Sequence, residues 1–127
     1  MKKKKEFLLM PRTIFPIDIL FTTADHEKIV RYIEKRKKYI LNDEEKESLQ
    51  ISGRAGRTVQ LLGKQIIVMV KKEKTSIGFD LCVLVHELIH AVLFVFAFAG
   101  HKINEREEEL LPYYVQYLLY EILKEYQ

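Results

Sequence analysis

The segment 86–90 of the chain has the pattern H-E-x-x-H, which places two imidazoles and one carboxylate at a spacing suited to metal chemistry. On a helix, residues four apart lie on the same face one above the other, so His86 and His90 can reach one tetrahedral metal ion. Glu87 lies about a quarter of a turn away. There its carboxylate can reach a metal-bound water without binding the metal. The motif therefore predicts a zinc site at His86 and His90, with Glu87 as the general base.

The motif lies within an apolar stretch, residues 81–100, whose only strongly polar side chains are these two histidines and this glutamate. Burying unpaired His and Glu would be costly, so metal binding is favoured over a core in which the three groups only bond to one another. The stretch is long enough to span a bilayer. An isolated membrane helix would, however, expose Glu87 to lipid. The central helix of a soluble core is favoured instead, and no membrane partner is expected.

Several elements must hold this motif helix in place. Residues 14–21 predict an early strand, and residues 26–39 predict a helix with Asp25 as its N-cap. Residues 42–50 are polar and predict a connection or one short helical turn. The β-rich segments 58–62 and 65–70 predict a hairpin. Gly63-Lys64 between them predicts a type II′ turn, because glycine adopts the required positive φ without strain.

The motif helix is expected to cover residues 83–99 and to end at Gly100. A last helix is expected from the N-cap Asn104 to about residue 125, with a bend at Pro112. The order strand, helix, hairpin, helix, helix predicts an α+β fold. In this fold a small antiparallel or mixed sheet contains the hairpin, which packs on the motif helix beside the C-terminal helix.

The size and composition predict one globular domain over residues 1–127. The chain is 48% hydrophobic and 31% charged, an ordinary balance for a folded protein. Its only cysteine, Cys82, cannot form an intrachain disulfide and is expected to be buried as a small apolar side chain. No secretory signal is recognised, because the apolar run at residues 7–10 is too short, so a cytoplasmic location is expected.

The amino-terminal part of the chain is basic. Its first 40 residues hold 11 Lys or Arg against 5 Asp or Glu. Lys2 to Lys5 are expected to lie in a flexible basic tail over residues 1–10. No aromatic residues interleave with these lysines, so no specific nucleic-acid partner is expected.

A third metal ligand is expected from the acidic cluster that opens the last helix, which comprises Glu105, Glu107, Glu108 and Glu109. If the chain reverses near residues 100–103, the equal rise of two antiparallel helices places residues 112–114 level with His90. Glu109 is the nearest acid to that level. Glu108 is the close alternative, because it precedes an apolar stripe. The third ligand is therefore expected to be Glu109, with Glu108 as the alternative.

Residues 86 to about 119 resemble the small zincins of the ImmA/IrrE-like kind and short phage- or prophage-encoded relatives. These families have an H-E-x-x-H helix followed by a helix that opens with acidic residues and continues through Leu and aromatic positions. The resemblance implies a minimal gluzincin-like domain with Zn²⁺ as cofactor and a peptide or protein as substrate. It also implies that a glutamate of the second helix, Glu109 or Glu108, completes the zinc site.

Two functions follow from these observations. The first is a zinc metallopeptidase that hydrolyses peptide bonds by a zinc-activated water. The alternative is a non-catalytic or regulatory zincin that binds a protein partner, with zinc mainly structural. A substrate could add as a strand along residues 65–70, although a plain core hairpin is an equal reading. Four residues are candidates for stabilising the transition state, and none is singled out: His101, Tyr113, Tyr114 and Tyr117. The sequence does not define the substrate or the oligomeric state.

Overall fold

The structure is a computed structural model that describes residues 5–10, 16–38, 40–62, 64–100 and 107–126. Within these residues, four strands form one mixed sheet in the order β1-β2-β4-β3, and four helices pack on it. The strands are β1 (Phe7–Leu9), β2 (Asp18–Thr22), β3 (Gly56–Leu61) and β4 (Gln65–Val70). The helices are α1 (His26–Lys37), α2 (Asp43–Ser48), α3 (Leu81–Phe98) and α4 (Glu107–Tyr126). The predicted α+β class is confirmed.

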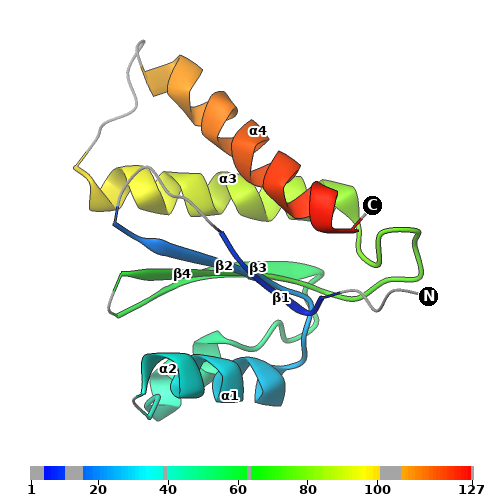
Figure 1. Cartoon of the computed structure of the whole chain (residues 1–127). Helices are drawn as coiled ribbons and strands as arrows, with labels where there is room; N and C mark the ends of the chain where they lie inside the picture. The colour runs from blue at the N-terminus through cyan, green and yellow to red at the C-terminus, as the bar shows by residue number, and fades with distance from the viewer. Residues whose placement is uncertain (1–4, 11–15, 39, 63, 101–106, 127) are drawn as a thin grey trace.

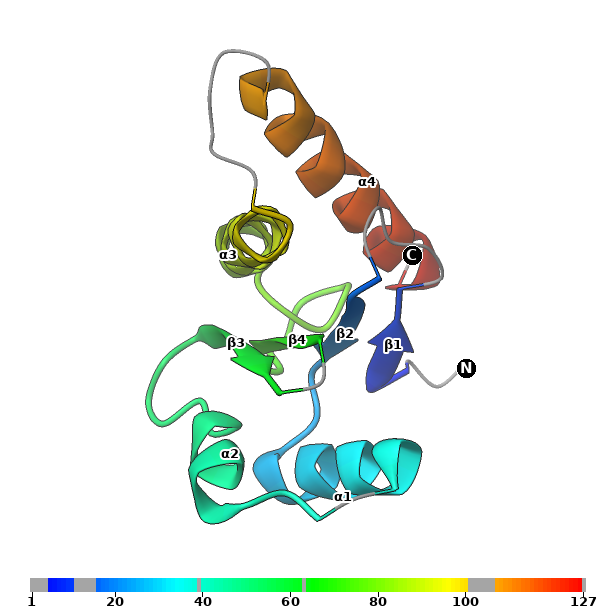
Figure 2. The ribbon, with the colours of Figure 1, turned by 90° about the vertical axis from the view of Figure 1, so that its left-hand side faces the viewer.

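The elements form three layers, with α3 and α4 on one face of the sheet and α1 and α2 on the other (Figures 1 and 2). In the described sheet β4 is central, paired parallel with β2 and antiparallel with β3. The short strand β1 pairs antiparallel with β2 at one edge, and β3 forms the opposite edge. Helix α3 contacts both β3 and β4, so the motif helix lies beside the β3 edge.

The two faces of β4 enter two different apolar cores. Ile66, Val68 and Val70 belong to the core beneath α3 and α4. Ile67 and Met69 belong to the core above α1 and α2. Successive side chains of a strand point to opposite faces, and a strand covered on both faces therefore has an uninterrupted apolar sequence. This explains why β4 is the central strand.

Capping residues set the ends of α1 and α3, and α3 begins two residues before the predicted start at residue 83. Asp80 is the N-cap of α3, and its carboxylate accepts hydrogen bonds from the backbone N–H groups of Cys82 and Val83. Gly100 follows the helix with a φ of 74°, a conformation that glycine adopts without steric cost. Asp25 caps α1 in the predicted way. The motif helix therefore begins and ends at local signals.

The amino-terminal segment differs from the prediction. Residues 7–9 were expected in a flexible tail over residues 1–10, but they form β1 and pair with β2. Strand β2 begins at Asp18, and the start of the predicted strand, residues 14–15, lies outside the described residues. A three-residue strand forms its hydrogen bonds with backbone groups that are distant in the sequence. Its own residues therefore do not reveal from the sequence that they form a strand.

The turn of the hairpin also differs from the prediction. Leu61 pairs with Gln65, so residues 62–64 connect β3 to β4. Lys64 has a φ of 61°, whereas a type II′ turn over Gly63-Lys64 requires a negative φ at its second residue. The predicted turn type is therefore wrong. A left-handed last residue is typical of three-residue hairpin loops.

Helix α4 continues through Pro112 to Tyr126, while its predicted N-cap, Asn104, lies outside the described residues. Among the described helices, α3 is long and apolar enough to cross a membrane by length and composition, and 39% of its residues are buried within the protein. The core helix of a soluble protein has the same character. Cys82 is exposed in the first turn of α3, so the prediction of a buried thiol is wrong.

Candidate active site

His86 and His90 lie next to each other on the exposed face of α3. Their Nε2 atoms are 3.2 Å apart, and the planes of their rings differ by 71°. Two nitrogen ligands of one tetrahedral zinc, each with a bond of about 2.0–2.1 Å, lie about 3.3 Å apart. The imidazole pair therefore fits a shared zinc ion. The same distance also allows one ring nitrogen to donate a hydrogen bond to the other.

Glu87 points between α3 and β3, and only 6% of its surface is exposed. The hydroxyl of Thr58 lies 2.8 Å from Oε1 of Glu87 and 3.0 Å from its backbone oxygen. By donating to the carboxylate, Thr58 satisfies one oxygen of a buried charged group and restricts its orientation. The carboxylate next to the two histidines is therefore held by the neighbouring strand.

The close contact between α3 and β3 depends on Gly56. A Cβ atom at this position would lie 2.8 Å from Cγ1 of Val83 and 3.0 Å from Cγ of Glu87. It would also lie 3.0 Å from the backbone oxygen of Met69, so it would crowd two side chains of α3 and the backbone of β4. Gly56 and Thr58 are two residues apart and face α3 together. Neither residue could be assigned to the site from the sequence, because 29 residues separate Thr58 from Glu87 and no local signal joins them.

An open cleft of about 670 Å³ lies between α3 and the edge strand β3. Its walls are formed by Ser48, Arg54, Gly56, Arg57, Thr58, Val59, Gln60, His86, Glu87, His90 and Phe94. An edge strand presents unpaired backbone N–H and C=O groups to the solvent. The cleft thus combines both histidines and the glutamate on one wall with a free strand edge on the other, and we take it as the candidate active site.

The edge strand beside this cleft is not the one that the sequence suggested. Residues 65–70 were offered as the edge to which a peptide could add, but they form the central strand β4. Strand β3, over Gly56–Leu61, lies at the edge instead. The apolar run of β4 is stable only when both of its faces are covered, which the centre of the sheet provides.

The structure does not bring Glu109 to the histidine pair. Glu109 is exposed near the start of α4. In the part of the chain that the structure describes, no group of three or more His, Cys, Asp or Glu side chains could hold a metal ion. Helix α4 crosses α3, and its first turn stands away from α3 in both views (Figures 1 and 2). The described residues therefore fit two of the three protein ligands of a catalytic zinc, and Glu109 stays a prediction. The alternative, Glu108, lies outside the residues whose side chains are described.

The predicted candidates for transition-state stabilisation lie elsewhere or outside the described residues. Tyr113 is exposed, and Tyr114 is buried in the core between the helices and the sheet. Tyr117 packs against that core with its ring near Tyr114. None of these three tyrosines lines the cleft. His101 lies outside the described residues.

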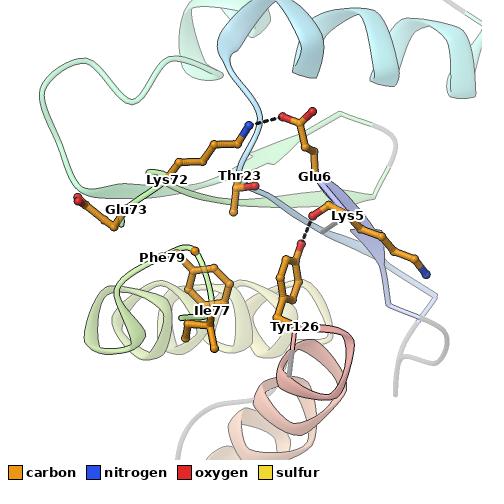
Figure 3. Close-up of a pocket in the computed structure, with 9 residues that line it drawn as sticks. Lys5, Glu6, Thr23, Lys72, Glu73, Ile77, Phe79 and Tyr126 are labelled. Carbon is orange, nitrogen blue, oxygen red and sulfur yellow. Dashed lines mark hydrogen bonds and ion pairs between the residues drawn. The ribbon is translucent and has the colours of Figure 1, made fainter. Parts of the chain in front are cut away.

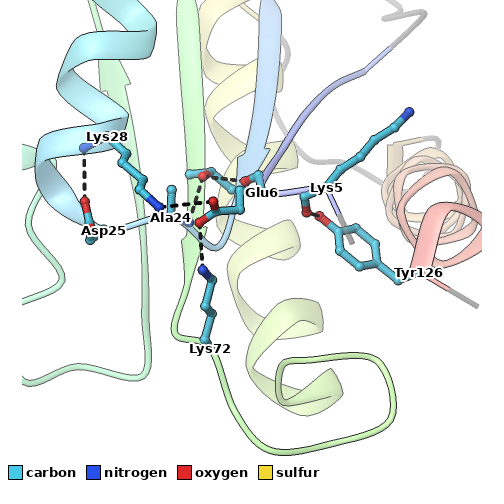
Figure 4. A network of polar contacts seen from close by, with 8 residues as sticks. Lys5, Glu6, Ala24, Asp25, Lys28, Lys72 and Tyr126 are labelled. Atoms are coloured by element: carbon cyan, nitrogen blue, oxygen red, sulfur yellow. Dashed lines mark hydrogen bonds and ion pairs between the residues drawn. The ribbon is translucent and has the colours of Figure 1, made fainter. Parts of the chain in front are cut away.

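A second cavity, of about 320 Å³, lies where the amino-terminal segment, the loop after β4 and the end of α4 meet (Figure 3). Its lysines are already paired, with Lys72 2.7 Å from Glu6 and Lys5 3.2 Å from Glu125. Lys28 also contacts Glu6, as Figure 4 shows. The hydrogen bond from Lys72 is the main cause that lowers the pKa of Glu6. Together with the bond from Lys28 it outweighs the opposing effect of burial. These ion pairs tie segments of the fold together and engage both lysines that line this cavity.

In comparisons with known proteins, no family model matches the chain, and neither a curated protein nor a solved structure matches it significantly. The resemblance to small zincins therefore rests on the H-E-x-x-H motif and on the acidic start of the following helix. The geometry of the cleft is an independent argument about chemistry.

Proposed function

We propose that this chain is a zinc-dependent metallopeptidase of the minimal zincin type, with His86 and His90 as metal ligands and Glu87 as the general base. The observation that carries the proposal is the separation of 3.2 Å between the two Nε2 atoms, on the wall of an open cleft that also contains Glu87. Their exposed position beside the edge strand β3 leaves both imidazoles accessible to a metal ion and a substrate.

The residues of the cleft have distinct roles in this proposal. Zinc bound by the two imidazoles would lower the pKa of a bound water towards neutrality and polarise the scissile carbonyl. Glu87 would accept the proton of the attacking water and deliver it to the leaving amine. Thr58 would keep the carboxylate oriented by its hydrogen bond to Oε1. Glu109, with Glu108 as the alternative, is the proposed third ligand.

The substrate is proposed to be a peptide or a protein segment in extended form. Its backbone would pair with the free edge of β3 and thereby add a strand to the sheet. That position places the bound backbone along the cleft, opposite the wall that carries His86 and His90. Helix α3 packs against β3, so the scissile bond and the motif would lie in the same cleft.

A quenched-fluorescence peptide library incubated with the zinc-loaded chain tests this function. We expect cleavage that a chelator abolishes and that Glu87→Gln also abolishes while zinc binding is retained. The amide fills the same space but cannot accept the proton of the water. A matched control is Glu27→Gln, which alters an exposed glutamate of α1 and should cleave like the wild type.

Two outcomes would change the proposal. Cleavage by Glu87→Gln at the wild-type rate would show that Glu87 is not the general base. A wild-type chain that binds zinc but cleaves no peptide would replace the peptidase with the alternative. That alternative is a regulatory zincin whose metal stabilises the fold and whose surface binds a partner protein.

A further inference from the structure

The cleft contains two arginines that the proposed reaction does not use. Arg54 precedes β3 and Arg57 lies on it, and both residues line the cleft. Among the described residues, no carboxylate forms an ion pair with either guanidinium group. Of the described residues, Glu87 is the only acid that lines the cleft, and its carboxylate accepts a hydrogen bond from Thr58. Arginine is always charged in proteins, so this wall of the cleft presents positive charge to whatever binds there.

Arg57 is also held in place. One of its terminal nitrogens, Nη1, donates a hydrogen bond of 3.0 Å to the backbone oxygen of Gln50. Its remaining N–H groups are left for a ligand, because a guanidinium group has five donors. A side chain that is already oriented loses less entropy when it binds, so Arg57 is a stronger candidate contact than the exposed Arg54.

The alternation of the strand places Arg57 on the opposite side of the edge from the motif. Gly56 and Thr58 face α3, as their contacts with Glu87 show. Arg57 and Val59 alternate with them, and Val59 belongs to the core above α1 and α2. A peptide added at this edge would alternate in the same way. The side chain next to the one that faces the histidines would therefore point towards Arg57.

We propose that the cleft selects acidic peptides, which carry Asp or Glu next to the residue that faces His86 and His90, with Arg57 as the main contact and Arg54 as the second. This inference rests on the proposed function for the course of the peptide, although binding does not require hydrolysis. A carboxylate accepts two parallel, charge-assisted bonds from a guanidinium group, which glutamine cannot match in charge. The specificity of the cleft therefore resides in the strand and its preceding loop, and the reacting groups reside in the helix.

Binding of three labelled octapeptides tests this inference. The peptides have Glu, Gln or Lys at alternate positions and are otherwise identical. Fluorescence anisotropy is measured with the full-length Glu87→Gln chain in the presence of zinc, so that the peptide stays intact. We expect the Glu peptide to bind about tenfold more tightly than the Gln peptide, the scale of one charge-assisted hydrogen bond. We also expect this difference to shrink as the salt concentration rises.

Variants of the arginines identify the source of the preference. Arg57→Gln should remove most of the difference between the Glu and Gln peptides. Arg57→Lys, which keeps the charge but loses the paired bonds, should remove part of it. Arg31→Gln is the matched control, because Arg31 is an exposed arginine of α1 that does not line the cleft. Thermal melting of each variant shows whether its fold is intact.

The outcomes separate this inference from the proposed function. Equal affinity for the Glu and Gln peptides overturns the inference, and so does a Glu preference that survives in the Arg54→Gln/Arg57→Gln double variant. Arginine-dependent binding without cleavage by the zinc-loaded wild type refutes the peptidase and leaves an acidic-peptide site. Cleavage of both peptides at one value of kcat/KM leaves the peptidase and refutes the inference. In an active enzyme, Arg57→Gln should raise KM for the Glu peptide about tenfold at unchanged kcat. The lost contact would stabilise the bound substrate and the transition state equally.

Discussion

The hydroxyl of Thr58 lies 2.8 Å from Oε1 of Glu87, although 29 residues separate the two in the chain. The contact joins the edge strand β3 to the motif helix α3. It exists because Gly56 leaves no side chain between the strand and the helix. The orientation of the proposed general base therefore depends on β3 as well as on the helix that carries it.

Replacing Thr58 with valine tests this dependence. Thr58→Val keeps the shape but leaves the buried carboxylate without its donor, so we expect the free energy of unfolding to fall by about 1–3 kcal/mol. In an active enzyme kcat should fall while KM changes little, because this hydroxyl donates to the proposed general base Glu87. Thr58→Ser retains the donor, so its free energy of unfolding and its kcat should be close to those of the wild type. Denaturant unfolding and steady-state kinetics measure both variants. If the valine and serine variants give the same values, the hydrogen bond does not orient Glu87.

Adding a methyl group at position 56 should separate the helix from the strand. Gly56→Ala is expected to lower the free energy of unfolding by about 1–3 kcal/mol, the usual cost of overpacking. The Cβ would contact Cγ1 of Val83 at 2.8 Å. Val83→Ala removes that atom, so Gly56→Ala should cost less in the Val83→Ala background. A double-mutant cycle by urea unfolding measures the coupling, and a coupling energy of zero would contradict the proposed clash.

Zinc content tests the histidine pair directly. We expect about one zinc per chain in protein purified without a tag, because the two Nε2 atoms are spaced as ligands of one tetrahedral ion. His86→Ala and His90→Ala should each lose this zinc when measured by mass spectrometry of the metal. His26→Ala is the control, because the ring of His26 bonds the backbone oxygen of Lys46, away from the cleft. Undiminished zinc in both cleft variants would refute the assignment.

The third ligand is tested by a pair of neighbouring substitutions. Glu109→Ala should weaken zinc affinity by at least about tenfold. Loss of a residue that only supports a metal ligand already costs about that much, and loss of a ligand should cost more. It should also lower the melting temperature of the zinc-loaded chain, because metal binding and folding are coupled. Competition with a zinc indicator measures the affinity. If Glu108→Ala weakens zinc binding and Glu109→Ala does not, the ligand is Glu108.

Acidification should weaken the ion pairs around Glu6. The pKa of Glu6 in the folded chain is below the ordinary value of 4.5, chiefly because Lys72 donates a hydrogen bond to its carboxylate. The unfolded state therefore binds more protons at mildly acidic pH. The stabilisation is fully present above the ordinary pKa and is lost as the pH falls through the lower folded pKa. Urea midpoints at pH 7 and pH 3 measure it, and the difference between the wild type and Glu6→Gln should narrow at pH 3. A constant difference would contradict this linkage.

The sequence alone determined the features that depend on neighbours within one or two helical turns. The H-E-x-x-H spacing places His86 and His90 together on one face of a helix, because a helix brings residues four apart into contact. Gly100 marks the end of that helix, because C-capping is a local hydrogen-bonding and steric property. The apolar run of residues 65–70 likewise indicated a strand. Each of these signals is complete within a short segment of chain.

The tertiary structure alone decided which strand has a free edge and what lies beside the motif. The position of β3 at the edge follows from the pairing of β4 with β2, which joins segments far apart in the sequence. The contacts of Glu87 with Thr58 and Gly56 follow from the packing of α3 on that edge strand. The position of Glu109 depends on how α4 crosses α3, which many side chains in the shared core set together. Such relationships arise from packing over the whole domain, and no short segment contains them.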